Sequence, residues 1–328
     1  MAVARPAHPP DAPRPQLTVL GSLNMDISVT VPRLPAPGAT VLGSAAVFTP
    51  GGKGANQAVA AARLGAAVRM VGCVGGDDFG RQLLASLREA GVDAAGVRVA
   101  DGVPTGLAMI SVDAAGENLI TVAPGANHEV GASDAARAAQ GPPDGGPCAA
   151  PDLLVISAEV PVAAIRAALA RARTSRCVLN LAPAPPEAAA IVADGVDWLV
   201  VNESEAGAVL GRDVQGLNEA RRAAAELSAA GARHTVVTAG AYGAVLASGG
   251  RDPLIIEAFG VRAVDTVGAG DCFVGALAVA LAAGIPAAEA VRAAAAAGAA
   301  AATRPGAQAG MPRPADVLSA TGLTWPVA

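Results

Sequence analysis

The regular alternation of strand and helix patterns in the second half of the chain restricts the fold more than any other feature. Short apolar runs typical of buried strands occur at 153–157, 177–181, 198–201 and 235–238. Helical patterns lie between them, at 162–173, 186–192, 204–210 and 217–230. The alternation predicts an α/β fold with a doubly wound, mostly parallel sheet flanked by helices.

Polar residues follow several of these strands. Glu159 comes after the first strand, Asn180 lies at the end of the second, and Asn202-Glu203-Ser204-Glu205 follows the third. A glycine-rich turn at 238–243 follows the fourth. In open parallel sheets, ligands bind at the carboxyl ends of the strands, so we expect these residues on the ligand-binding side.

Two β-rich segments interrupt this alternation in the first half of the chain. Residues 27–48 are rich in Val, Thr, Pro and Gly, and residues 105–112 with 118–122 predict a hairpin. Insertions from two separate places suggest one small sheet that covers a site. We therefore predict a β-sheet lid, formed by about residues 26–50 and 103–127, on a single domain spanning 17–320.

The segments outside this domain are expected to be tails. Residues 1–16 contain five prolines and no apolar run, which predicts a disordered N-terminal tail and excludes a signal peptide. Residues 321–328 form a predicted C-terminal tail. With no strongly apolar run of 18 residues, no membrane span is expected, and the expected location is the cytoplasm.

Composition excludes several other functions. The 328 residues are 52% hydrophobic, and only 2% are aromatic, with a net charge of −5. Too few aromatic residues to stack bases and no basic excess argue against nucleic-acid binding. The four cysteines (Cys73, Cys148, Cys177 and Cys272) form no CxxC pair, so zinc is not expected and reduced thiols are.

The stretch 263–273 (AVDTVGAGDCF) predicts an anion-binding loop. Gly268, Ala269 and Gly270 precede Asp271, which opens a long apolar helix pattern. The first amides of a helix lack intrahelical partners, and small residues let an anion approach them closely. Asp271 alone is equally compatible with a simple helix cap. Two glycines before it exceed what a cap needs, which favours a functional loop.

Two further motifs favour binding of a small polar ligand. Asn24 and Asp26 alternate on an extended segment, so both side chains leave one face and suit adjacent hydroxyls of a polyol, although both residues also favour turns. Gly51-Gly52-Lys53-Gly54-Ala55-Asn56-Gln57 precedes a predicted helix at 58–64. It fails the Walker A pattern at Val47 and Gly54. Its glycines more simply let the backbone approach a ligand, with Lys53 and Asn56 as donors.

Together these residues resemble the PfkB family of sugar kinases, and specifically its ribokinase branch, from about residue 17 to 320. The motifs at 51–57 and 265–271 match the two family signatures, and residues 21–26 match the ribokinase branch. Asn202-Glu203-Ser204-Glu205 fits the magnesium-linked NxxE motif of the family. Four motifs in family order make the resemblance specific.

The resemblance implies a role for each matching position. Asp271 corresponds to the catalytic base, and Gly268, Ala269 and Gly270 to the anion hole. The ribose contacts correspond to Asn24, Asp26, Gly52, Lys53, Asn56, Glu159 and Asp271. The ATP contacts correspond to Asn202, Thr238, Gly240, Gly243 and Gly270. A monovalent-cation site, usually for K⁺, corresponds to Asp265 and to the carbonyls of Val267, Ala301, Arg304 and Gly306. Glu205 corresponds to the residue that organises Mg²⁺ through water.

Two positions depart from the family pattern. Gly310 stands where a serine often closes the cation site, which puts cation dependence in question. Alanines at 294 and 295 stand where an asparagine often contacts the nucleotide, which implies looser adenine selectivity.

The resemblance implies ATP-dependent phosphorylation of D-ribose at O5, with Mg²⁺ and K⁺ as cofactors, by a homodimer assembled through the lid. A kinase for 2-deoxyribose, adenosine or another pentose is the main alternative. A non-catalytic sugar or nucleotide sensor is a second alternative, although a sensor has no need of a base such as Asp271.

Overall fold

A nine-stranded sheet forms the centre of the molecule. The computed structural model describes residues 14–140, 151–172 and 176–327. The sheet order is β13-β12-β11-β10-β9-β8-β1-β4-β5, and all neighbours are parallel except the pairs that β12 makes with β11 and β13. The strands are β1 (Gln16–Leu20), β4 (Ala67–Gly75), β5 (Asp93–Ala100), β8 (Leu153–Ser157), β9 (Arg176–Asn180), β10 (Val196–Asn202), β11 (Ala232–Thr238), β12 (Ala244–Ser248) and β13 (Leu254–Ile256). The predicted doubly wound α/β sheet is confirmed.

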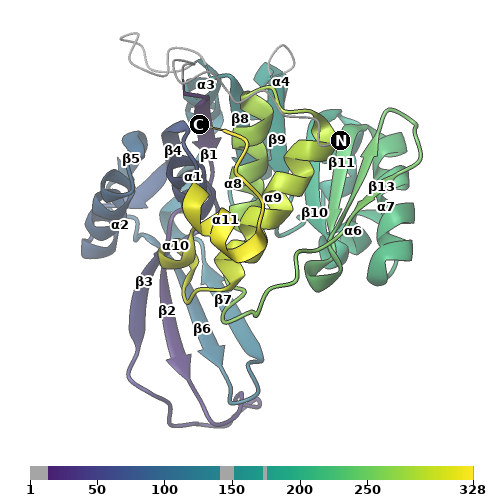
Figure 1. Ribbon diagram of the computed structural model, residues 1–328. Coiled ribbons are helices and arrows are strands. Elements are labelled where there is room, and N and C mark those ends of the chain that lie inside the picture. The colour runs from purple at the N-terminus through teal and green to yellow at the C-terminus, as the bar shows by residue number, and fades with distance from the viewer. Residues whose placement is uncertain (1–13, 141–150, 173–175, 328) are drawn as a thin grey trace.

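Helices cover both faces of this sheet and create two separate cores. The first face carries α1 (Lys53–Arg63), α2 (Asp78–Glu89), α8 (Ala269–Ala282), α9 (Ala287–Ala302), α10 (Ala307–Gly310) and α11 (Pro314–Thr321), the last four in yellow-green and yellow in Figure 1. The second face carries α3 (Ala132–Gln140), α4 (Val162–Arg171), α5 (Ala188–Ala193), α6 (Glu203–Leu210) and α7 (Gly216–Ala230). Alternate side chains of one strand supply the two cores: Val19 of β1 packs in the first and Leu20 in the second.

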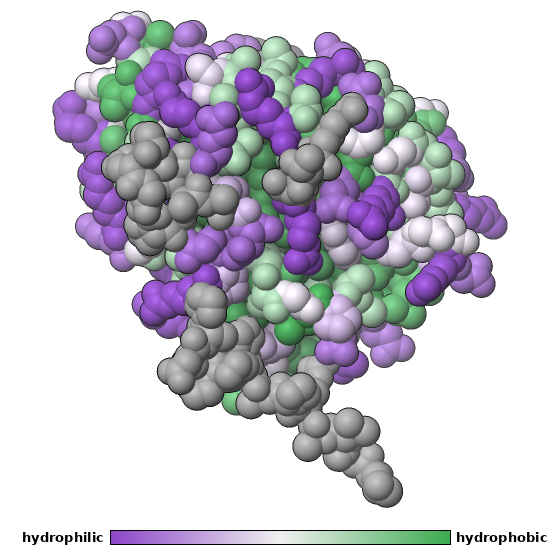
Figure 2. All heavy atoms as spheres, turned by 90° about the horizontal axis from the view of Figure 1, so that it is seen from above, coloured by the Kyte–Doolittle hydropathy of each residue, from purple (hydrophilic) through white to green (hydrophobic). Residues whose placement is uncertain are grey.

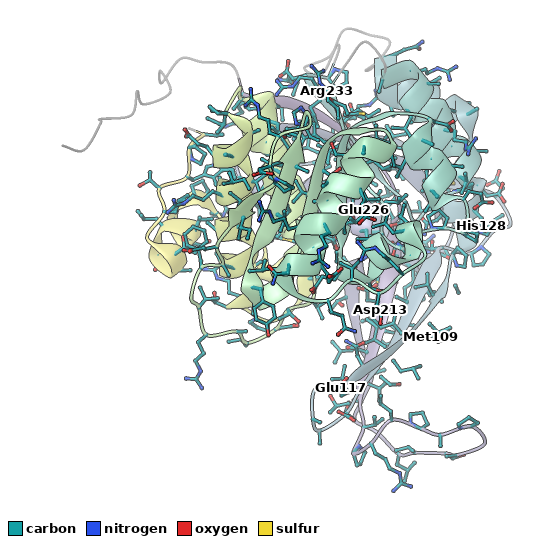
Figure 3. All side chains as sticks on the ribbon, turned by 90° about the vertical axis from the view of Figure 1, so that its right-hand side faces the viewer. Met109, Glu117, His128, Asp213, Glu226 and Arg233 are labelled. Carbon is teal, nitrogen blue, oxygen red and sulfur yellow. The ribbon has the colours of Figure 1, made fainter. Side chains whose placement is uncertain are left out.

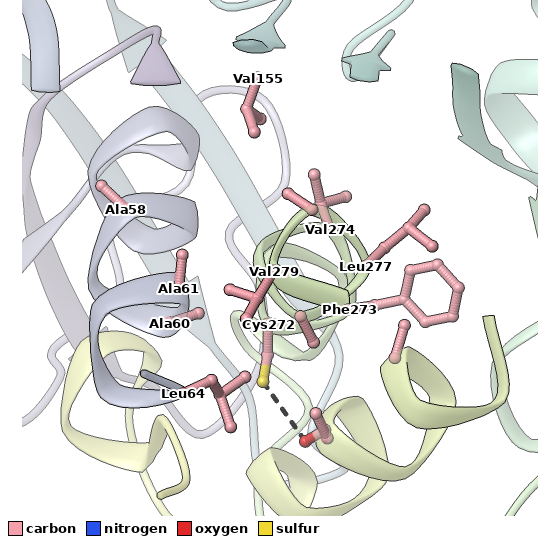
Figure 4. Close-up of a cluster of buried hydrophobic side chains, with 14 of the residues drawn as sticks. Ala58, Ala60, Ala61, Leu64, Val155, Cys272, Phe273, Val274, Leu277 and Val279 are labelled. Atoms are coloured by element: carbon pink, nitrogen blue, oxygen red, sulfur yellow. Dashed lines mark hydrogen bonds between the residues drawn. The ribbon is translucent and has the colours of Figure 1, made fainter. Parts of the chain in front are cut away.

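Small residues bring α1 and α8 into close contact. Figure 4 shows Ala60 and Ala61 of α1 facing the helix that carries Cys272 and Val279. A Cβ atom at Gly275 would lie 2.6 Å from the Gln57 carbonyl oxygen, so no larger residue fits there without movement. The close approach aligns the N-terminal ends of two helices that are more than 200 residues apart in the chain.

The lid is a separate four-stranded sheet of order β3-β2-β6-β7. It consists of β2 (Asn24–Thr30), β3 (Val47–Gly51), β6 (Gly106–Val112) and β7 (Asn118–Ala123), with β2 and β6 parallel and the outer pairs antiparallel. Figure 1 shows it extending below the α/β body, and Figure 3 shows Met109 and Glu117 on it, away from the body. The predicted lid is confirmed.

Two helices begin earlier than the sequence patterns indicate. The pattern predicts a helix from residue 58, but α1 begins at Lys53, so the glycine motif forms the first turns of the helix rather than a loop before it. Likewise, α8 begins at Ala269 with Gly268 as its N-cap residue, and Asp271 lies inside the first turn. The interpretation of Asp271 as a simple cap is wrong, because Gly268 is the N-cap residue and the Asp271 carboxylate accepts hydrogen bonds from Asn56 and Gln57 of α1.

The end of the chain packs against the domain instead of forming a tail. Trp325 and Val327 are buried, and the Trp325 Nε1–H donates to the Leu64 carbonyl oxygen at 3.0 Å. A buried indole needs an acceptor, and the carbonyls at the end of α1 have no intrahelical donor. The predicted N-terminal tail lies mostly outside the described residues, as does the surface loop predicted at 141–151.

In the part of the chain that the structure describes, no helix has the length and apolar character to cross a bilayer. Hydrophilic residues are spread over the face seen from above in Figure 2, with hydrophobic residues between them. Within the same part of the chain, Cys73, Cys177 and Cys272 are free and buried, as expected for reduced thiols; Cys148 lies outside it.

Candidate active site

Asp271 lies at the centre of the candidate site, at the start of α8. Gly268 has φ of 77°, a left-handed conformation that favours glycine, and it turns the chain into the helix. The Ala269 amide donates to the Thr266 carbonyl oxygen at 3.1 Å. Among the described residues, the amides of Gly270 and Asp271 have no hydrogen-bond partner. The Gly270 amide of the predicted anion hole and the amide of Asp271 are therefore open to an anion, whereas the Ala269 amide of the predicted anion hole is already engaged.

Consecutive residues of α1 hold the Asp271 carboxylate. The Asn56 Nδ2 donates to one carboxylate oxygen at 2.9 Å, and the Gln57 Nε2 donates to the other at 3.1 Å. Asp271 is 8% exposed, so a ligand can still reach it. Because α1 begins with the glycine motif, the contact joins the two motifs that the sequence singled out.

Acidic side chains and one lysine gather beside this carboxylate. Burial, followed by the negative charges of Glu159 and Asp271, raises the pKa of Asp26 to about 7. The pKa of Lys53 is raised, most strongly by Asp271, and Glu159, Glu205 and Asp26 act in the same direction. The Glu159 carboxylate accepts from the Lys53 backbone amide at 3.2 Å. The sequence analysis assigned all of these residues to the substrate site except Glu205, and the structure brings them together.

The Asn24 side chain accepts a hydrogen bond from Asn127, a residue to which the sequence analysis assigned no role. The Asn127 Nδ2 donates to the Asn24 Oδ1 at 2.7 Å, and Asn127 also exchanges hydrogen bonds with the backbone of Leu23. Ser22 is a second such residue, because its hydroxyl donates to Glu159 at 2.6 Å. Both brace the predicted sugar contacts. Asn127 and Ser22 occur near the motifs, but their roles depend on contacts across more than 100 residues.

A cavity of about 1310 Å³ opens on the other side of the Asp271 loop. Its lining includes all five predicted nucleotide contacts, namely Asn202, Thr238, Gly240, Gly243 and Gly270. Helix α9 contributes only alanine and glycine to this wall: Ala295, Gly298, Ala299 and Ala302. The cavity has the size of a nucleotide site and reaches the open amide of Gly270.

The NxxE motif forms a capping box at the start of α6. The Glu205 amide donates to the Asn202 Oδ1 at 2.8 Å, and the Asn202 amide donates to the Glu205 Oε2 at 2.9 Å. Burial raises the pKa of Glu205, while the Asn202 amide and Lys53 oppose this rise. The cap orients Glu205 and leaves its second carboxylate oxygen available, which suits a water-mediated contact to magnesium.

The residues of the predicted cation site also come together. The Asp265 carboxylate accepts from the amides of Val267 at 2.9 Å and Gly306 at 2.8 Å, which joins the loop before α8 to the loop before α10. A Cβ atom at Gly310 would lie 3.3 Å from the Arg304 carbonyl oxygen and 3.5 Å from that of Ala301. Backbone carbonyls converge there, and oxygen ligands of this kind fit a hard cation such as K⁺.

Zinc-type sites are not among these arrangements. Within residues 14–140, 151–172 and 176–327, no group of three or more His, Cys, Asp or Glu side chains is placed to hold a metal. A carboxylate beside open helix amides, between a polar cluster and a nucleotide-sized cavity, instead defines a site for phosphoryl transfer to a small polar acceptor.

Comparison with known proteins agrees with this class. The model of the pfkB family carbohydrate kinases matches residues 14–314, and the chain belongs to this family. It is 34% identical to the ribokinase of Haemophilus influenzae over 313 residues, which covers 93% of this chain and 98% of that protein.

Two other similar proteins bear on the substrate. The deoxyribokinase of Salmonella typhi is 34% identical over 265 residues, which covers 80% of this chain and 84% of that protein. The structure of Arabidopsis thaliana ribokinase complexed with ribose and ATP aligns with a TM-score of 0.78 at 29% identity, covering 93% of this chain and 98% of that one. This chain is therefore a sugar kinase, and kinases of its family use Mg-ATP.

Proposed function

We propose that this kinase phosphorylates D-ribose at O5 with ATP, giving ribose 5-phosphate and ADP. One observation carries the proposal: Asp271 is hydrogen-bonded to Asn56, a predicted sugar contact, and Gly270, whose amide is open, lines the nucleotide-sized cavity. Phosphoryl transfer needs an acceptor hydroxyl, a base and stabilisation of negative charge in this arrangement. The similarity to ribokinases favours ribose as the acceptor.

The residues have distinct roles in this mechanism. Asp271 accepts the proton of the sugar hydroxyl as that oxygen attacks the terminal phosphorus. The amides of Gly270 and Asp271 stabilise charge on the transferring group, and an oxyanion donor of this kind contributes about 3 kcal/mol. Asn24, Asp26, Lys53 and Glu159 hold the sugar hydroxyls, and the lid covers them and excludes water.

Metal ions would support this chemistry. Magnesium bound with ATP would neutralise charge on the phosphates, and Glu205 would hold it through water. A monovalent cation between Asp265 and the carbonyls of Ala301, Arg304 and Gly306 would shape the loop that presents the open amides. Asp265 and Val267 lie in the same loop as Gly268, so cation binding would be coupled to the geometry of this loop.

We also propose that two copies associate through the lid. The strand register places Ile120 and Val122 on the same lid face as Asp26, and these apolar side chains are 52% and 45% exposed. A second lid packed on this face would bury them beside the sugar site.

Phosphorylation of 2-deoxyribose is the alternative that a specific observation favours, because a deoxyribokinase is as similar in sequence as the ribokinases. The test is kcat/KM for ribose, 2-deoxyribose, fructose and adenosine, with Asp271→Asn as the inactive control. We expect ribose to rank first, because Asp26 and Asn24 suit vicinal hydroxyls. A higher kcat/KM for adenosine or 2-deoxyribose would refute the choice of ribose.

A further inference from the structure

The Gln57 side chain makes hydrogen bonds to protein groups, and binding of the sugar or the nucleotide does not explain them. Its side chain is fully buried, with an exposed fraction of 0%, directly under the catalytic carboxylate. Its Nε2 donates twice, to the Asp271 Oδ1 at 3.1 Å and to the Asn180 Oδ1 at 2.9 Å. Both hydrogens of one amide group are therefore used to join α8 to the end of β9.

The backbone of the central sheet determines which group donates and which accepts in these hydrogen bonds. The Asn180 Nδ2 donates to the Val200 carbonyl oxygen of β10 at 3.2 Å, and a carbonyl can only accept. Asn180 must then present its oxygen to Gln57, and Gln57 must present its nitrogen to Asp271. A flipped Gln57 amide would place its oxygen against two acceptors. The backbone of a central strand thus determines which group faces the catalytic carboxylate.

The side-chain oxygen of Gln57 lies in an unfavourable environment. This Oε1 is buried and has no hydrogen-bond partner among the described residues. A buried carbonyl oxygen without a hydrogen-bond partner destabilises the fold. The Gln57 backbone packs closely on α8, since a Cβ atom at Gly275 would lie 2.6 Å from the Gln57 carbonyl oxygen. Stability alone would favour an apolar side chain here, so the donated hydrogen bonds point to a role in the site.

We infer that Gln57, held by Asn180, is a positioning residue that fixes the orientation of the Asp271 carboxylate for proton transfer. The inference rests on the proposed role of Asp271 as the base. Asn56, 5% exposed, holds one carboxylate oxygen, and the fully buried Gln57 holds the other. Without Gln57 the carboxylate can rotate about its Cβ–Cγ bond, and fewer bound complexes are aligned for reaction.

The test compares Gln57→Met, Asn180→Ala and the double variant with the wild type, using the sugar that the wild type phosphorylates fastest. Methionine keeps the length and volume of glutamine but donates no hydrogen bond. We expect kcat to fall about 10- to 100-fold in Gln57→Met, because small misplacement of a catalytic group has effects of this size. The KM for sugar and for ATP should stay within about twofold, since neither substrate loses a contact.

The double variant shows whether Asn180 acts through Gln57. Asn180→Ala alone should lower kcat about 3- to 10-fold, because Gln57 keeps its bond to Asp271 but loses its own anchor. The double variant should have the kcat of Gln57→Met and not the product of the two losses. Thr235→Val is the matched control, because it also removes a buried polar group, a hydroxyl without a partner in the described part of the chain. It should leave kcat unchanged.

Three results would overturn the inference. One is a kcat of Gln57→Met within twofold of the wild type. Another is a raised KM for sugar with unchanged kcat, which would make Gln57 a substrate contact. The third is additive losses in the double variant. If Gln57→Met does not fold, Asn180→Ala alone decides, and unchanged kcat there is sufficient to reject the relay. Wild-type activity on a sugar other than ribose would reject the substrate proposal and leave this comparison intact.

Discussion

At the scale of single residues, the site concentrates negative charge around one lysine. Burial, followed by the negative charges of Glu159 and Asp271, raises the pKa of Asp26 to about 7. Lys53 only partly compensates. This charge balance makes the sugar site sensitive to pH within the physiological range.

We expect the kcat/KM for sugar to fall as the pH drops below about 7. In the free enzyme Asp26 takes up a proton in this range, and a protonated carboxyl loses an acceptor for a sugar hydroxyl. Asp26→Asn should have low kcat/KM at every pH and lack this acidic limb. Initial rates at low sugar concentration between about pH 5.5 and 8.5 measure it. A wild-type profile without the limb would contradict the assignment.

The same residue should link stability to pH. The pKa of Asp26 is about 7 in the folded protein, against 3.8 for its ordinary value. Its favourable contribution to folding is therefore complete below about pH 4 and is lost as the pH rises through 7. Urea unfolding at about pH 5 and pH 8 should show a larger loss of stability for the wild type than for Asp26→Asn. Equal losses in both proteins would be inconsistent with a raised pKa.

Gly310→Ser should strengthen the response to potassium. The added Cβ would lie 3.3–3.5 Å from the carbonyl oxygens of Ala301, Arg304 and Pro305, so a serine fits with little adjustment and adds a hydroxyl ligand. We expect the K⁺ concentration for half-maximal activity to fall several-fold, measured by titrating KCl at constant ionic strength. Gly310→Ala, which adds the Cβ without the hydroxyl, is the control. An equal effect of both variants would exclude the hydroxyl as a ligand.

At the scale of elements, α1 organises both ends of the site. Its first turns carry Lys53, Asn56 and Gln57, and its last residue, Arg63, reaches α10. The Arg63 Nη1 donates to the carbonyl oxygens of Gln308 at 2.7 Å, Ala309 at 3.3 Å and Met311 at 2.9 Å. One helix therefore supports the sugar donors and the backbone around Gly310.

Replacing this arginine should destabilise the protein. We expect Arg63→Met to lower the free energy of unfolding by about 2 kcal/mol, because the loss leaves carbonyl oxygens of α10 without a charged donor. Urea unfolding followed by circular dichroism measures the change. Arg81→Met is the control, because Arg81 pairs with Asp78 on the exposed surface of α2 and should change stability by less than about 0.5 kcal/mol. Similar effects of the two variants would argue against a special role for Arg63.

Local patterns predicted the existence of most elements but not where two important helices begin. Glycine is unfavourable inside helices, so Gly54 and Gly270 suggest loop residues rather than first turns. Tertiary packing decides otherwise, because Gly54 lies against Gly21 at a distance where no Cβ fits. The sequence predicts that Glu205 belongs to the NxxE motif. Its hydrogen bonds with Asn202 in the capping box are visible only in the structure.

At the scale of the whole molecule, the lid offers an apolar face next to the sugar site. All six residues of β7 are exposed. The register separates them by face, with Ile120 and Val122 on the Asp26 side and Leu119 with Met109 on the other. The stacking of Phe48 on Phe79 of α2, with ring centroids 5.9 Å apart, connects the lid to the body.

We expect the wild type to elute with twice the chain mass of 31.8 kDa, and Ile120→Asp to elute as a monomer. A charge buried between two lids has no partner there, which disfavours association. Light scattering coupled to gel filtration measures the mass. Leu119→Asp introduces the same charge on the opposite lid face and should remain dimeric. A monomeric wild type, or dissociation by both variants, would reject the proposed interface.

The sequence predicted which motifs belong to the site, but not how the catalytic carboxylate is held. The contact between Gln57 and Asp271 spans 214 positions of the chain. It exists because α1 and α8 approach closely at Gly275, and no local pattern encodes that approach. The same limit applies to the hydrogen bond between Asn127 and Asn24, and to Trp325 in a segment that was predicted to be a tail.

The packing of Trp325 against the end of α1 has a consequence for folding during synthesis. The helix that carries the sugar donors ends in a carbonyl satisfied by the indole, and the strand beneath it, β1, pairs with β8, made more than 130 residues later. Domains usually fold as units while the ribosome works. Here α1 is completed only when Trp325, 261 positions after Leu64, has been made, so loss of Trp325 would leave the Leu64 carbonyl without its donor.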